Sequence, residues 1–176
     1  MEDLQVTRDQ VAVLAFVLAH VDTKEEVEIL SFRLADECGD LFHAAVLGLG
    51  ADDDGREISL LVTLPAHSQG VFMALTVGHK MEVARMLAGL EDYERETWHA
   101  LRPLESVVTD HPSGIRALFL LSPATHAAIS GIPDSAMINA RERHFLLVLP
   151  ITAEEYACKM QGGVDALLVR LQESDK

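Results

Sequence analysis

The sequence has few of the residues that would indicate a redox-active, secreted or membrane-bound protein. Its only two cysteines, Cys38 and Cys158, do not form a C-x-x-C pair, so we expect reduced thiols and no disulfide. The apolar run Val11–Val21 covers about eleven residues, whereas a membrane-spanning helix needs ~20. That run also lacks the basic start and the small-residue cleavage site of a signal peptide. These absences predict a cytoplasmic protein.

Basic residues are scarce as well. Fourteen Lys and Arg oppose 28 Asp and Glu, which gives a formal net charge of −14. Such a surface repels phosphate backbones and anionic lipids, so we expect no nucleic-acid and no membrane partner. It would attract a basic protein partner, although the excess acid can also serve only to keep the protein soluble.

The apolar residues in the first third of the chain alternate between helical and extended spacing. Thr7 can cap a helix over about 7–21, in which apolar residues recur every three to four positions. A period-two pattern predicts a strand over Val27–Leu34. The runs Phe42–Gly50 and Glu57–Leu64 flank an Asp-Gly pair, which predicts a hairpin.

The middle of the chain predicts one long helix and one short strand. The helix covers about Lys80–Leu101. Because glycine costs about 1 kcal/mol relative to alanine in a helix interior, we expect a kink or break near Gly89. A buried strand is predicted over Ala117–Leu121. Turn-forming residues and Pro133 predict that Ala124–Arg143 is a loop with one short helical turn.

The closing segment is the most regular part of the sequence. A continuous apolar run predicts a buried strand over Phe145–Leu149 that ends at Pro150. Thr152 and Glu155 have the spacing of a capping box, so a helix should begin there. A Gly-Gly pair at 162–163 should break that helix. An amphipathic helix follows, with apolar residues at Val164, Leu167, Leu168 and Leu171.

This order of elements predicts an α+β (mixed α/β) fold. We expect a single domain over residues 1–176, with the N-terminal helix at about 7–21 and the core at about 22–173. Its central sheet, mostly antiparallel or mixed, should have about four to six strands flanked by helices.

No phosphate or metal motif emerges from the sequence. The glycine-rich stretch Gly48–Gly55 has its third glycine misplaced for a dinucleotide fingerprint and carries acids where a pyrophosphate would lie. Its three aspartates fit a hairpin turn better than a calcium loop. The eight histidines lack metal-ligand spacing, although distant ones can converge in space; they are His20, His43, His67, His79, His99, His111, His126 and His144.

The candidate nucleophiles are weak. Ser122 or Thr125 with His126 follows a strand, but a turn that ends the strand explains these residues better. Cys158 lies in a predicted helix beside Lys159, and neighbours in a helix point to different faces. We therefore predict no catalytic, cofactor-binding or metal-binding residue.

Two residue pairs permit other readings. Glu154 and Glu155 resemble a carboxylate dyad, but adjacent helical residues diverge and capping already accounts for Glu155. Trp98 and His99, near the end of the long helix, can be a contact surface or the edge of the core. The sequence favours the core edge.

Four stretches resemble the suppressor-of-fused domain family, and together they cover about Val21–Glu173. They are Val27-Glu-Ile-Leu, the strand Glu57–Pro65, Val83–Ala88 with Glu94–Trp98, and Phe145–Glu155 with Gly163–Leu168. The chain departs from the family at Leu47–Ala51, where a Thr-x-Gly-Met-Ser type of segment would be expected.

The resemblance implies a non-enzymatic protein-binding module. It also suggests an immunity protein that neutralises a toxin, because bacterial stand-alone members include such proteins and an acidic surface suits a basic toxin. We expect no second domain, so the partner groove of two-domain members is not carried over. Two alternatives remain: an acidic secretion-type chaperone that binds a client, and a hydrolase whose site is assembled from distant residues.

Overall fold

One sheet organises the whole chain. The computed structural model describes residues 6–23, 26–34, 39–66, 68–109 and 113–174. Its helices are α1 (Arg8–Leu18), α2 (Lys80–Thr97) and α3 (Ala153–Ser174). Its strands are β1 (Glu28–Arg33), β2 (Leu41–Ala51), β3 (Glu57–Thr63), β4 (Gly70–Thr76), β5 (Ser106–Val108), β6 (Ile115–Leu121), β7 (Ser135–Ile138) and β8 (Arg141–Thr152).

The strands form a mixed sheet in the order β1-β2-β3-β4-β8-β6-β5, and β7 pairs with β8. Among the described residues, the β4–β8 pairing is parallel and every other strand pairing is antiparallel. The α+β fold is thus confirmed, with eight strands instead of the four to six predicted. The additional strands are β4, β5 and β7, and β7 lies inside the segment that was predicted as a loop.

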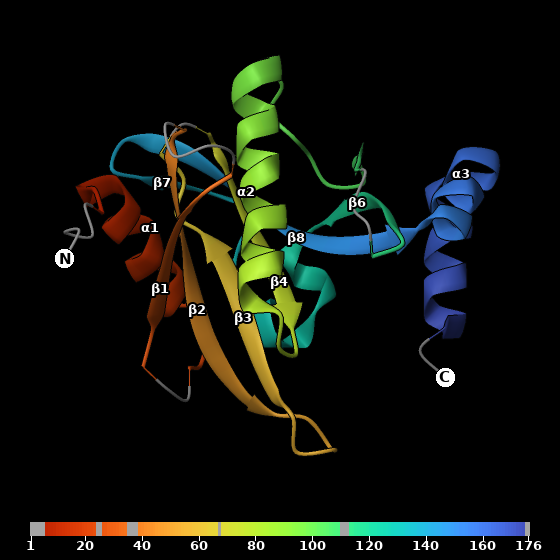
Figure 1. Ribbon diagram of the computed structural model, residues 1–176, viewed down its shortest axis with the longest axis horizontal. Coiled ribbons are helices and arrows are strands. Elements are labelled where there is room, and N and C mark those ends of the chain that lie inside the picture. The colour runs from red at the N-terminus through yellow and green to blue at the C-terminus, as the bar shows by residue number, and fades with distance from the viewer. Residues whose placement is uncertain (1–5, 24–25, 35–38, 67, 110–112, 175–176) are drawn as a thin grey trace.

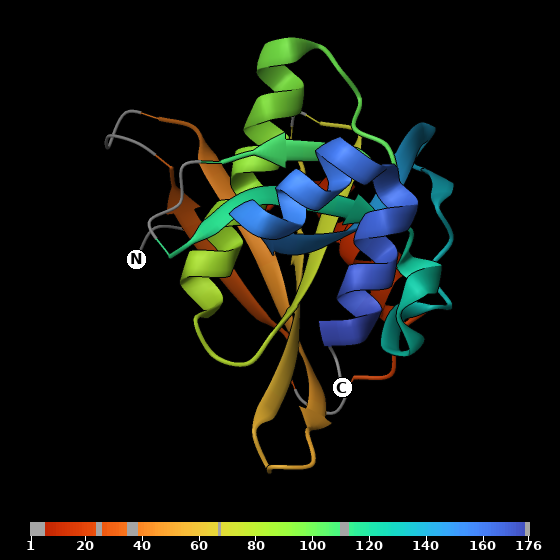
Figure 2. The same cartoon turned by 90° about the vertical axis from the view of Figure 1, so that its right-hand side faces the viewer.

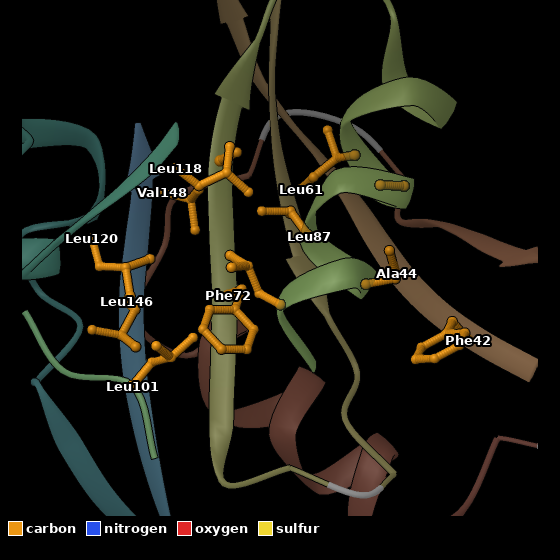
Figure 3. Close-up of a cluster of buried hydrophobic side chains, with 14 of the residues drawn as sticks. Phe42, Ala44, Leu61, Phe72, Leu87, Leu101, Leu118, Leu120, Leu146 and Val148 are labelled. Carbon is orange, nitrogen blue, oxygen red and sulfur yellow. The ribbon is translucent and has the colours of Figure 1, made fainter. Parts of the chain in front are cut away.

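Both faces of the sheet are buried, which explains why most strands read as continuous apolar runs. Helix α2 covers one face, where Phe72 lies among side chains from β2, β3, β6 and β8, and Leu87 of α2 points toward them (Figure 3). Helices α1 and α3 cover the opposite face at different ends of the sheet (Figure 1). Neighbouring residues such as Leu118 and Phe119 therefore pack against different helices.

Several local predictions are confirmed. Thr7 and Gln10 form a capping box at the start of α1. Strands β2 and β3 form the predicted hairpin, which extends beyond the rest of the molecule (Figures 1 and 2). Thr152 and Glu155 cap α3 through reciprocal bonds of 2.8 and 3.3 Å. Gly163, at φ 82°, breaks α3 into two pieces that lie across β6 and β8 (Figure 2).

Two predicted breaks are wrong. Helix α2 continues through Gly89 and ends at Thr97, and the next residue, Trp98, adopts a left-handed φ of 56°. Strand β8 continues through Pro150, which pairs with Leu118 of β6. Because β4 pairs with β8 only as far as Leu147, the other side of β8 is unpaired at Pro150, and a missing backbone N–H is tolerated there.

Candidate protein-binding surface

The candidate nucleophile Ser122 does not form a catalytic pair with His126. Its hydroxyl donates to Asp134, and its oxygen caps a short 3₁₀ turn by accepting the N–H of Ala124. His126 caps the next turn, since its Nδ1 accepts the N–H of Ala128 at 3.2 Å. Thr125 donates to the carbonyl of Ser122. These side chains hold a loop together.

The residues of α3 are similarly engaged. Cys158 is a half-buried free thiol, whereas Cys38 lies outside the described residues. The Lys159 ammonium donates to Ser106 at 2.6 Å and lies over the ring of Phe119, and burial lowers its pKa. Lys159 thus attaches α3 to the sheet. Glu154 pairs with Arg170 at 2.9 Å, while Glu155 caps the helix, so the two carboxylates diverge as predicted.

Two of the described histidines have side-chain partners of their own. His43 is buried and lies 2.8 Å from the hydroxyl of Ser31; burial lowers its pKa. His99 contacts Glu105 at 3.0 Å, and His67 and His111 lie outside the described residues. Within residues 6–23, 26–34, 39–66, 68–109 and 113–174, no three His, Cys, Asp or Glu side chains converge on a metal-sized site.

Trp98 departs furthest from the sequence-based interpretation. Its side chain is 94 % exposed, so the prediction that it forms the edge of the core is wrong. The reason is its left-handed backbone at the end of α2. The chain leaves the helix at this residue, and Leu101, three positions later, is again buried in the core beneath α2.

A groove runs between α2 and the edge of the sheet. Its volume is about 520 Å³. The floor contains Leu90 and Leu118, both part of the core beneath α2, and the open side is bordered by Tyr93 and Val108. Val108 is 46 % exposed and Tyr93 is 37 % exposed. Apolar surface is therefore accessible along one side of α2.

Acidic side chains surround this groove. Glu82, Asp92 and Glu96 line it, with Arg85 as the one basic lining residue among those described. Arg85 is drawn toward β1, where it donates to the carbonyl of Arg33 and lies over the ring of Phe32. Burial and, secondarily, the charge of Glu96 raise the pKa of Asp92.

Strand β5 forms the far wall of the groove and ends the sheet. In the part of the chain that the structure describes, β5 pairs only with β6. Glu105 accepts from Leu120, and Thr109 donates to Arg116. Because backbone groups alternate along an antiparallel strand, Ser106 and Val108 direct theirs to the free edge. A free edge beside an apolar groove can accept another strand.

No helix among the described residues is long and apolar enough to cross a membrane.

Comparison with known proteins identifies the relatives of the chain. A crystal structure described as that of a suppressor of fused protein homolog from Neisseria gonorrhoeae FA 1090 superposes with a TM-score of 0.65. It is 16 % identical, and the match covers 96 % of this chain and 91 % of that one. At this identity, the likeness concerns the fold alone. No curated protein matches.

The family model is more specific. The model of the suppressor of fused protein (SUFU) matches residues 25–176, which include all eight strands and the helices α2 and α3. Helix α1 precedes the match. The chain therefore belongs to the suppressor of fused family.

Proposed function

We propose that this chain is a non-enzymatic protein-binding protein that holds an extended segment of its partner in the groove between α2 and β5. The observation that carries the proposal is the free edge of β5 beside an apolar groove. Backbone bonds to Ser106 and Val108 would provide affinity. Apolar side chains of the segment would enter the groove over Leu90 and Leu118, which is how strand addition combines affinity with selectivity.

Charge supports a basic partner. Three carboxylates line the groove, and the whole chain carries a formal charge of −14. An acidic field accelerates encounter with a basic protein and makes association sensitive to salt. This fits a cytoplasmic immunity protein that neutralises a basic toxin, and we propose that role as the biological setting. Family membership supports the binding function in general.

The test is affinity capture with the purified full chain, followed by mass identification of the retained proteins. Val108→Pro removes a backbone N–H that faces the free edge and leaves the bonds to β6 in place. Proline at position 169 would break α3, so the control is Val169→Ala, at a valine of similar exposure that lies outside the groove. Circular dichroism would confirm that both variants are folded.

We expect wild type and Val169→Ala to retain the same basic protein, and Val108→Pro to lose it. Retention should weaken as salt rises. If Val108→Pro binds as well as wild type, the edge of β5 is not the site. If a partner encoded beside this chain is not retained by the wild-type protein, the binding role itself is contradicted.

A further inference from the structure

A second site adjoins Trp98 and shares no lining residue with the groove. It is a pocket of about 300 Å³ lined by Ser68, Gln69, Glu94, Trp98, His99 and Ala100. Trp98 is 94 % exposed, whereas Glu94, four residues earlier on the same helix, is only 7 % exposed. A carboxylate is thus recessed beside an open aromatic face.

The backbone conformation and the exposure of Trp98 do not help to stabilise the fold. Its φ of 56° lies in the left-handed region, where glycine or asparagine normally ends a helix and a bulky side chain is rare. Its ring gains almost no burial in return. A residue that breaks a local rule without stabilising the fold is a candidate for binding.

Glu94 can accept further hydrogen bonds. Its Oε1 accepts the N–H of Leu101 at 2.8 Å, and its Oε2 accepts the N–H of Gly70 at 3.1 Å. An ionised carboxylate offers about four lone-pair positions. Burial raises the pKa of Glu94 despite these bonds and the nearby His144 and His99, and no Lys or Arg is among the residues that line the pocket. A cation there would compensate a poorly solvated charge.

We propose that this pocket binds an arginine side chain of a protein partner, with the guanidinium stacked on Trp98 and hydrogen-bonded to Glu94. A planar guanidinium can stack on an indole and donate to a carboxylate at once, which the compact ammonium of lysine does less well. Because the indole ring is exposed, a protein partner can cover it when its arginine enters the pocket. The acidic net charge favours a basic partner. This inference rests on the proposed function only in assigning the arginine to a protein partner.

The pocket can be tested without knowledge of the partner. Trp98 is the only tryptophan of the chain, so its fluorescence reports directly on the site. We expect a saturable change on titration with N-acetyl-arginine amide. The neutral analogue N-acetyl-citrulline amide should bind at least about tenfold more weakly, because it lacks the cation. Titrations of ¹⁵N-labelled protein should shift the amides of Gly70 and Leu101, which donate to Glu94.

Variants separate this pocket from other acidic surface. Trp98→Ala removes an exposed side chain and should abolish the shifts at Gly70 and Leu101, while Met137→Ala, at a residue 68 % exposed on β7, should leave them intact. Equal responses to arginine and citrulline amides would overturn the inference. Shifts that persist in Trp98→Ala would also overturn it.

The two proposals fail separately. If the arginine titration fails while Val108→Pro still loses the partner, only the pocket assignment is wrong. If arginine binds at Trp98 but the groove variants retain the partner, the groove is wrong and the pocket stands.

Discussion

Replacing Gly89 with alanine should stabilise the protein. Gly89 lies inside α2, and a Cβ built there meets no atom within 4 Å beyond the backbone of its own helix. Glycine in a helix interior costs about 1 kcal/mol relative to alanine, so Gly89→Ala should raise the free energy of unfolding by about that amount. For a domain of this size, this raises Tm by roughly 2–4 °C.

The assay is thermal unfolding followed by circular dichroism, with Gly162→Ala as the matched control. At Gly162 a Cβ would lie 2.7 Å from the Cβ of Ala166, so this control should lower Tm. A lower Tm for Gly89→Ala would refute the reasoning, because it would mean that the helix needs the freedom of glycine at that point.

Three further predictions concern stability. Gly70→Ala should lower Tm, since its Cβ would lie 2.6 Å from the ring of Phe72 and 2.9 Å from Glu94; an unchanged melting curve would contradict this geometry. Thr152→Ala should cost about 1 kcal/mol in urea unfolding through loss of the cap of α3, whereas Thr109→Ala, outside any cap, should cost less. Because burial lowers the pKa of His43 from its ordinary value of 6.5, its neutral form contributes stability above that pH which is lost as pH falls through the lowered pKa. Urea unfolding between about pH 8 and pH 5 should show this acid-side loss in wild type and a smaller loss in His43→Asn; equal slopes would contradict it.

Local signals in the sequence correctly predict where two helices begin and where one hairpin turns. The capping boxes at Thr7 and Thr152 and the turn between β2 and β3 depend on residues within a few positions of each other. Contacts between residues so close in the sequence can be predicted from the sequence alone. The prediction at Pro150 is wrong because the consequence of a proline depends on which side of the strand is paired, and that follows from the distant strands β4 and β6.

Two of the three missed strands, β5 and β7, have a similar cause. Strand β5 has three residues and β7 has four, too few for a periodic pattern to emerge. Each is a strand because β6 or β8 provides its hydrogen bonds.

The candidate surface is hard to predict for a related reason. The groove combines one side of α2 with the edge of the sheet, and nothing in the sequence states that β5 is the last strand. In the sequence, Trp98 continues the apolar residues on one face of the predicted helix and so resembles a core residue. In the structure its backbone is left-handed and its side chain lies in solvent. The sequence predicts a helix that continues to Leu101, whereas α2 ends at Thr97, so the apolar pattern does not mark the turn at Trp98.

The most direct test of groove binding uses Gly89, which lines the groove. Gly89→Ala adds one methyl group, while Gly89→Phe adds a ring in the same open space. The measurement is the Kd of the captured partner for wild type and both variants by calorimetry. We expect Gly89→Ala to bind within about twofold of wild type and Gly89→Phe to bind at least about tenfold more weakly while remaining folded. Wild-type affinity in a folded Gly89→Phe protein would contradict binding in the groove between α2 and β5.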